Sequence, residues 1–227
     1  MEKSNFYAAY KGFLRDGSAA VRLRGFCCSK ARGECFLVYD FVPNGNLLAY
    51  LDLKDGDGMV LDWSTRVSIV KGIAKGIAYI HQYKVNKPAL VHQNISAKNV
   101  LIDHRFNPLL SDSGLHNILT IDIVFGALKA SAAMGYLAPG YANDYAFGVV
   151  VFQVLSGKQK ITNLVHLGAE SCCRFQDFID PNLHGRFFEY EATKVARLAW
   201  LCTHNSPIER PSMEEVVQEL SNCSSRL

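Results

Sequence analysis

Short apolar runs separated by turn signals dominate the first 42 residues of the chain. Phe6 to Leu14 mixes aromatic and small residues and runs into Asp16–Gly17, a pair typical of hairpin turns. Val21 to Cys28 and Cys35 to Val42 have the length and apolar content of buried strands. Residues 43–46, Pro-Asn-Gly-Asn, then stop the pattern abruptly. We therefore predict three strands in this part of the chain.

Helical periodicity replaces the strand pattern after this turn. Asp62 is a good N-cap for a helix that reaches about His81. Residues 145–156 are apolar almost all round, which is typical of a buried central helix, and Gly157 suits its C-terminal cap. The apolar stripe of the first helix consists of Trp63, Val67, Val70, Ile73, Ile77 and Ile80.

Two further helices complete the C-terminal part of the chain. Residues 191–203 are amphipathic, and the last helix begins at Ser212, which stands three residues before Glu215 at capping-box spacing. A small sheet followed by a mostly helical body is an α+β arrangement. Two short strands are predicted between the helices, Leu90–His92 and Val100–Ile102, and a turn that contains Asn107 and Pro108 leads to Leu109–Ser111.

Composition excludes several functional classes. Apolar residues make up 49% of the 227 residues, and the net charge is only +3 without a basic stripe, so nucleic-acid binding is not indicated. The seven cysteines include no Cys-x-x-Cys pair, which favours small buried thiols in a reducing compartment over a metal cage. The longest apolar run, residues 145–155, is too short to cross a bilayer. We expect a chain without a transmembrane segment, located in the cytoplasm.

Four motifs occur in a fixed order from residue 91 onward. Their order and separations are specific as a set, although each motif alone would be a weak signal. They are Val91-His92-Gln93-Asn94-Ile95-Ser96-Ala97-Lys98-Asn99, Ser111-Asp112-Ser113-Gly114, Gly135-Tyr136-Leu137-Ala138-Pro139-Gly140 and Pro207-Ile208-Glu209-Arg210-Pro211.

This set resembles the catalytic loop, metal-binding turn, end of the activation segment and final Arg-Pro of protein kinases. The sequence at residues 39–47, 61–63 and 72–79 is similar to that of plant receptor-like kinases. Among these, it is most similar to the leucine-rich-repeat type. The resemblance implies a bilobal protein-kinase-like fold. We assign residues 1–43 to a truncated N-terminal β lobe and residues 44–227 to a mainly helical C-terminal lobe.

The catalytic loop departs from the family at its reactive positions. In the family's His-Arg-Asp motif the Asp accepts the proton of the substrate hydroxyl. Here His92 is retained, Asn94 stands at the position of that Asp, and Ser96 stands at the position of the catalytic Lys. An amide cannot take the proton, and losing a general base typically costs roughly 10²–10⁴ in rate. Asn99 matches the family's metal-binding Asn.

The metal-binding turn is retained in part. Asp112 matches the magnesium-binding Asp of Asp-Phe-Gly, and Gly114 matches its Gly, but Ser113 replaces the Phe. Asn99 and Asp112 are therefore the residual cofactor and metal positions that the resemblance implies. A tight loop without any metal remains an alternative reading of the same residues.

The nucleotide-binding side has lost whole elements. The family carries a glycine-rich loop, a strand with a phosphate-binding Lys and a helix with its Glu partner. The first glycine here is Gly12, and only Ala19 and Ala20 separate the turn at residues 16–18 from Val21. The Lys–Glu pair therefore cannot form. We expect no cofactor, and Mg-ATP binding that is weak at best.

The end of the activation segment has lost an acidic residue. Gly140 replaces the Glu of Ala-Pro-Glu, while its usual ion-pair partner, Arg210, is retained. Arg210 must find another partner, and Asp144 and Glu209 are the candidates. Asp144 also resembles the central-helix Asp that holds the backbone of the catalytic loop, a structural role that does not depend on activity.

Three hypotheses remain open. The first is a pseudokinase that binds or scaffolds protein partners in receptor-like kinase signalling, at the cytoplasmic face of the plasma membrane through those partners. The second is a Ser/Thr kinase with residual activity, which the retained Asn99 and Asp112 favour. The third is a truncated kinase fragment without a role of its own. Mg-ATP binding and a cooperative thermal transition discriminate between them.

Overall fold

A computed structural model describes the parts of the chain from which the fold can be read. These are residues 2–3, 8–9, 23–29, 34–54, 58–81, 92, 95–111, 142–161 and 178–222.

Four α-helices, six short strands and four 3-10 turns make up the described ranges. In chain order they are β1 (Glu2–Lys3), β2 (Ala8–Ala9), β3 (Leu23–Ser29), β4 (Glu34–Tyr39), η1 (Leu47–Tyr50), α1 (Trp63–His81), η2 (Ala97–Asn99), β5 (Val100–Ile102), β6 (Pro108–Leu110), α3 (Ala142–Ser156), η6 (Pro181–Leu183), α4 (Glu189–Cys202), η7 (Pro207–Glu209) and α5 (Met213–Asn222).

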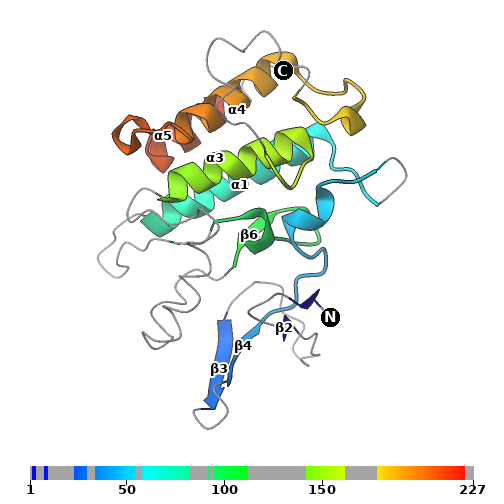
Figure 1. The fold of residues 1–227 in the computed structure, drawn as a ribbon, viewed down its shortest axis with the longest axis vertical. Coiled ribbons are helices and arrows are strands. Elements are labelled where there is room, and N and C mark those ends of the chain that lie inside the picture. The colour runs from blue at the N-terminus through cyan, green and yellow to red at the C-terminus, as the bar shows by residue number, and fades with distance from the viewer. Residues whose placement is uncertain are drawn as a thin grey trace.

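The helices form one layered body. α1 and α3 lie side by side in its middle, and α4 and α5 cover them on the side away from the strands (Figure 1). α4 packs closely on α3 because Gly148 has no side chain: a Cβ there would lie 2.7 Å from the carbonyl oxygen of Ala199. The largest fully buried side chains come mostly from this body: Phe147, Phe152, Ile69, Ile73, Ile77, Leu155, Met213 and Leu220.

α1 begins where its capping residue predicts. The Oδ1 atom of Asp62 accepts a hydrogen bond from the Thr65 amide at 2.8 Å, which satisfies one of the amides left free at a helix start. The first turn is closed by the Arg66 amide, which donates to the Asp62 carbonyl at 3.0 Å. The helix ends at His81. Both predicted ends of this helix are confirmed.

The β5–β6 hairpin packs against α1 at two glycines. A Cβ at Gly72 would lie 2.4 Å from Pro108 Cγ, and one at Gly76 would lie 3.1 Å from Leu110 Cδ1. The turn of the hairpin is held by Asp103, whose Oδ1 accepts the amides of Arg105 and Asn107, each at 2.8 Å. The residues just before β5 belong to the candidate site described below.

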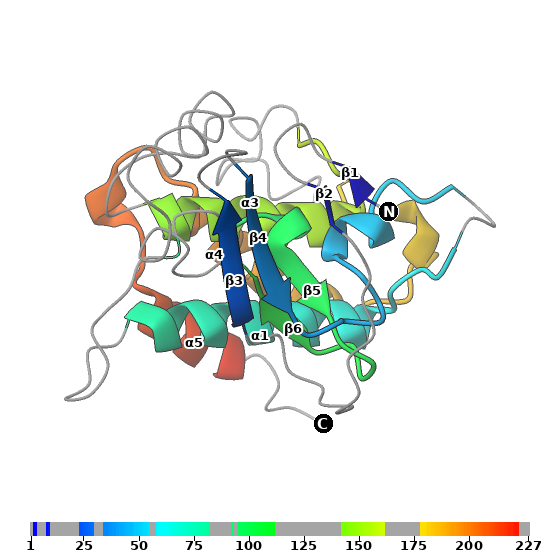
Figure 2. The same cartoon turned by 90° about the horizontal axis from the view of Figure 1, so that it is seen from below.

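The N-terminal strands lie at the opposite end from α4 and α5 (Figures 1 and 2). β3 and β4 form one antiparallel pair, and β1 and β2 form another. The connection after β4 then attaches to the β5–β6 hairpin: Gly45, with φ at +67°, places its carbonyl 2.8 Å from the Ile102 amide. Asn44 Nδ2 donates to the Asp103 carbonyl at 2.7 Å.

The remaining element predictions have mixed outcomes. The strands expected near residues 21–28 and 35–42 are β3 and β4, and the one at 100–102 is β5, each within three residues at either end. β6 lies where only a turn leading to residues 109–111 is predicted. Gly157 has the positive φ, +68°, expected of a helix C-cap. Of the predicted strand 6–14, only Ala8–Ala9 are described, as β2, and the turn at 16–17 lies outside the described residues. His92 is not in a strand, and its predicted strand neighbours 90 and 91 are also outside.

The fold class is confirmed: the described chain is mainly helical with few strands. Within the described ranges, no helix has the length and apolarity needed to span a membrane.

Candidate functional site

The catalytic-loop residues that the structure describes follow α1 in the chain and lead into β5. His92 is buried, with 2% of its surface exposed, and Asn99 is buried at 5%. Ser96 is half-buried and precedes η2, and its carbonyl accepts the Asn99 amide at 2.9 Å. Asn94, at the position of the catalytic base, lies outside the described residues.

The β5–β6 hairpin brings Asn99 next to Ser111. The Asn99 carbonyl accepts hydrogen bonds from Ser111, from the amide at 2.9 Å and from Oγ at 3.1 Å. Ser111 directly precedes Asp112 in the chain. Asp112 and Gly114 themselves lie outside the described residues, so their roles stay predictions.

Of the two residual metal positions, the structure describes Asn99 alone. Among the described residues, no group of three or more His, Cys, Asp or Glu side chains could hold a metal ion. Asn99 contributes one neutral amide, and Asp112, the other position that the resemblance implies, lies outside the described residues. Magnesium is usually held by carboxylates together with phosphate oxygens. The described residues alone therefore do not form a magnesium site.

Asp144 lies in the first turn of α3, where α1 and α5 approach it. Burial raises the pKa of its carboxyl, while the charges of His81 and Arg210 act in the opposite direction and Glu214 adds to the rise. Its carboxylate is thus partly desolvated and close enough to Arg210 to feel its charge. Asp144, one of the two candidate partners of Arg210, therefore has an electrostatic link to it.

Arg210 has contacts that the sequence did not predict. Its Nε donates to the His204 carbonyl at 2.8 Å, and its guanidinium carbon lies 5.2 Å from the centre of the Tyr145 ring. Glu209, the other candidate, has its Oε2 3.2 Å from His204 Nε2. A cation over an aromatic face is stabilised by the ring quadrupole. Arg210 therefore joins η7 to α3 and to the residues that follow α4.

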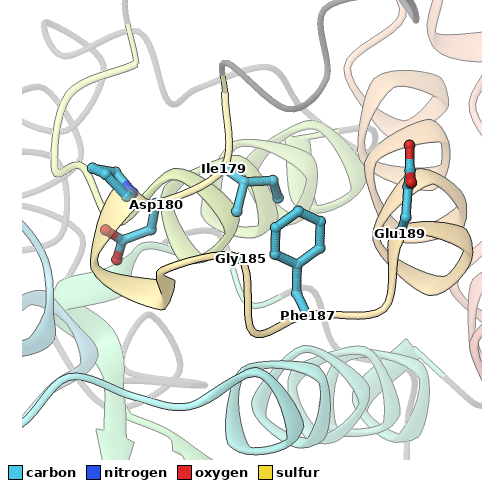
Figure 3. A pocket seen from close by; sticks show the side chains of 6 residues that line it. Ile179, Asp180, Gly185, Phe187 and Glu189 are labelled. Carbon is cyan, nitrogen blue, oxygen red and sulfur yellow. The ribbon is translucent and has the colours of Figure 1, made fainter.

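A cavity of about 430 Å³ lies elsewhere, between η6 and the start of α4 (Figure 3). Ile179 and Phe187 lie in its middle, with Asp180 on one side and Glu189 on the other. Its remaining lining residues are Pro181 and Gly185. No kinase-motif residue lines it, and its lining offers no nucleophile paired with a base. We assign it no catalytic role.

The cavity wall is built on a buried network that sequence reasoning missed. Asp180 pairs with Arg66 of α1 at 2.5 Å, and the Phe187 ring packs on Trp63 at a centroid distance of 5.8 Å. Trp63 Nε1 in turn donates to Glu191 Oε2 at 2.7 Å. One signal was available: Arg66 stands on the apolar stripe of α1, between Trp63 and Val70, where a charged residue must find a partner.

Residues 14–220 match the family described as protein tyrosine and serine/threonine kinase. This chain belongs to the protein kinase family. Its relatives include a probable LRR receptor-like serine/threonine-protein kinase of Arabidopsis thaliana, At1g53420, 33% identical over 88% of this chain and 23% of the relative. Cold-responsive protein kinase 1 of the same plant is 33% identical and covers 96% of this chain, which spans 68% of it.

A solved structure supports the same placement. The pseudokinase domain of BIR2, described as an immune regulator of the RLK/Pelle family, is similar with a TM-score of 0.72 and 32% identity. The similarity covers 90% of this chain and 64% of the BIR2 chain. The kinase-like chain spans 34% or less of the length of the first receptor-like relatives it matches.

Proposed function

We propose that this kinase-family chain is a pseudokinase: a binding or scaffolding module that does not transfer phosphate. The observation that carries the proposal is the missing nucleotide-binding apparatus. Two alanines, Ala19 and Ala20, occupy the place where the family has the Lys strand and the Glu helix. The alignment with cold-responsive protein kinase 1 runs over 272 residues, more than the 227 of this chain, which supports the loss of whole segments.

The reactive groups of the catalytic loop support the same conclusion. Asn94 offers an amide where a carboxylate takes the substrate proton, and Ser96 offers a hydroxyl where a Lys stabilises the transferred phosphoryl. Mg-ATP supplies the phosphoryl group in active relatives. This chain retains only Asn99 and Asp112 for it, so binding would be weak and unproductive.

The helical body supports a binding role. Its core is continuous from α1 to α5, and Arg210 contacts the Tyr145 ring and the His204 carbonyl. A helical lobe that stays packed can still bind a protein partner on its surface, even without catalytic residues. BIR2, a pseudokinase domain of similar fold, is described as an immune regulator. By analogy we propose protein partners in receptor-like kinase signalling, at the cytoplasmic face of the plasma membrane.

The test is a thermal melt of the purified chain with and without Mg-ATP. A ligand at 100 times its dissociation constant stabilises a protein by about 2.7 kcal/mol, which shifts the melting temperature clearly. We expect no shift here, and a clear shift for the kinase domain of cold-responsive protein kinase 1 as the positive control. A shift of similar size in this chain would favour the kinase with residual activity.

A urea titration followed by circular dichroism separates the scaffold from the non-functional fragment. A scaffold with a continuous core should unfold in one cooperative transition. A broad, non-cooperative loss of signal, without change on adding Mg-ATP, would favour the fragment.

A further inference from the structure

The β3–β4 hairpin sets two cysteines directly opposite each other. The antiparallel register pairs Cys28 of β3 with Cys35 of β4. Directly opposed residues in such a pair have Cα atoms about 4.5–5.5 Å apart. A disulfide bond spans Cα atoms about 4.4–6.8 Å apart. The backbone register of this hairpin therefore meets the distance requirement for a disulfide between these two positions.

The same register excludes Cys27 as the disulfide partner of Cys35. Cys27 is opposite Phe36, and successive residues of a strand belong to opposite faces of the sheet. Cys28 and Cys35 thus share one face, and Cys27 belongs to the other. The sequence alone, with Cys27 and Cys28 adjacent, cannot make this distinction.

The register is regular where the two cysteines meet. The pairing runs without interruption from Phe26 opposite Leu37 to Ser29 opposite Glu34, and the irregularity lies at the other end, between Leu23 and Gly25. The pair of cysteines is one position from the last described pair of the two strands, Ser29 opposite Glu34. A bond at this position would link strands that are already aligned.

We propose that Cys28 and Cys35 form a reversible dithiol–disulfide site that responds to hydrogen peroxide. The thiolate of one cysteine attacks a peroxide oxygen, the O–O bond breaks, and a sulfenic acid forms as the other oxygen leaves as water after protonation. The second cysteine then attacks the sulfenic sulfur, which forms the S–S bond and releases a second water. Two thiols lose two electrons and two protons, and one peroxide becomes two waters. Exchange with a small thiol such as glutathione reverses the reaction.

The site has a structural consequence for the hairpin. β3 and β4 form a sheet of two strands in the described part of the chain, and isolated two-stranded pairs are only marginally stable in water. A covalent bond between the strands holds their register. β4 leads directly into the connection at Asn44 and Gly45 that attaches to β5, so oxidation fixes the element that enters the helical lobe. This inference does not depend on the proposed pseudokinase role.

Trypsin mapping tests the site on the whole purified chain. The protein is reduced, freed of reductant, exposed to hydrogen peroxide, alkylated to block remaining thiols and digested without reductant. Trypsin cleaves after Lys30 and Arg32, between the two cysteines, so the disulfide joins peptide 25–30 to peptide 33–54. We expect this linked pair after oxidation, its loss on adding dithiothreitol, and slower hydrogen exchange of the hairpin amides while it is present.

Matched variants assign the bond. Cys27→Ser should keep the linked peptides, and Cys28→Ser and Cys35→Ser should each lose them. Cys202 is an internal reference, because burial raises the pKa of its thiol to about 12 and it should stay reduced in the folded protein. Fragment spectra of the unsubstituted protein separate Cys27 from Cys28, so the assignment stands even when a variant fails to fold.

Three results would overturn the proposal. The first is a link from Cys35 to Cys27 in place of Cys28. The second is a link found only between two copies of the chain. The third is that Cys28 and Cys35 both remain alkylated after a peroxide dose that oxidises a reference dithiol peptide.

Discussion

The guanidinium of Arg66 and the carboxylate of Asp180 form a buried ion pair, with Nη2 2.5 Å from Oδ2 and side chains only 3% and 5% exposed. The other guanidinium nitrogens donate to backbone carbonyls, Nε to Leu61 at 2.8 Å and Nη1 to Val154 at 2.7 Å. One side chain therefore joins the start of α1, the end of α3 and the segment that enters η6. Each of the three guanidinium nitrogens therefore has a partner in the fold.

Replacing either member of this pair should destabilise the protein strongly. Truncating one partner of a buried ion pair leaves an uncompensated charge and costs about 3–5 kcal/mol. We expect Arg66→Ala and Asp180→Ala each to lower the free energy of unfolding by about this amount, measured by urea denaturation. Arg105→Ala removes an exposed arginine and should change stability by less than about 0.5 kcal/mol. Equal midpoints for Arg66→Ala and Arg105→Ala would contradict the structural role of the pair.

Two glycines in helices should respond oppositely to the same substitution. Gly148→Ala places a Cβ 2.7 Å from the Ala199 carbonyl oxygen and 2.7 Å from Thr203 Cγ2, so α3 and α4 must separate. Overpacking of this kind costs about 1–3 kcal/mol. Gly76→Ala meets only the end of the flexible Leu110 side chain at 3.1 Å and gains up to about 1 kcal/mol of helix propensity.

The measurement is the pair of urea midpoints on the same background. We expect Gly148→Ala to lie below the unsubstituted protein and Gly76→Ala to lie at or above it. The same midpoint for both variants would mean that α3 and α4 do not approach as closely as the fold requires.

The cap of α1 should make stability depend on pH in the acidic range. Hydrogen bonds from Thr65 lower the pKa of Asp62 below its ordinary 3.8. A carboxyl with a lowered folded-state pKa stabilises the fold above its unfolded pKa, and this contribution is lost as pH falls through the folded value. Asp62→Ala should cost about 1 kcal/mol at pH 7, and the penalty should shrink as the pH falls below 3.8.

Asp62→Asn is the matched control for this titration. An Asn side chain still accepts the Thr65 amide but carries no charge, so its free energy of unfolding relative to Asp62→Ala should not vary with pH in this range. The result that would contradict the assignment is a penalty for Asp62→Ala that is the same at pH 3 and pH 7.

Local rules predicted the parts of this fold that local chemistry determines. Asp62 caps the start of α1 through a hydrogen bond three residues away, and Gly157 follows the end of α3 with a positive φ. The capping box is also present: the Ser212 amide donates to Glu215 Oε2 at 2.8 Å, and the Glu215 amide donates to Ser212 Oγ at 3.3 Å. The resemblance to kinases predicted an N-terminal β lobe followed by a helical lobe, which the periodicity of the sequence alone does not predict.

Long-range partners could not be predicted in the same way. Arg66 and Asp180 are 114 positions apart, and the sequence around either residue contains no signal that identifies the other as its partner. The partner of Arg210 was narrowed to Asp144 and Glu209, but its contacts with Tyr145 and the His204 carbonyl depend on how η7 and α4 meet α3. Such contacts follow from the packing of whole helices, which a single sequence does not specify. The roles of Asn94, Asp112 and Gly114 rest on the resemblance, because the described residues do not include them.

Restoring the catalytic carboxylate alone should not restore activity. Asn94→Asp returns a group that can accept a proton, and a general base typically contributes roughly 10²–10⁴ in rate. That contribution needs a triphosphate held in place, and this chain has neither the Lys strand nor the Glu helix that would hold it. We expect Asn94→Asp to incorporate no more labelled phosphate into a generic Ser/Thr substrate than the unsubstituted chain does. The kinase domain of cold-responsive protein kinase 1 serves as the active control in the same assay, and its variant with Asn at the catalytic Asp should fall to the background. Phosphate incorporation that appears only with Asn94→Asp and rises in proportion to its concentration would show that the base is the only lesion, because a contaminating kinase would label the substrate in both preparations.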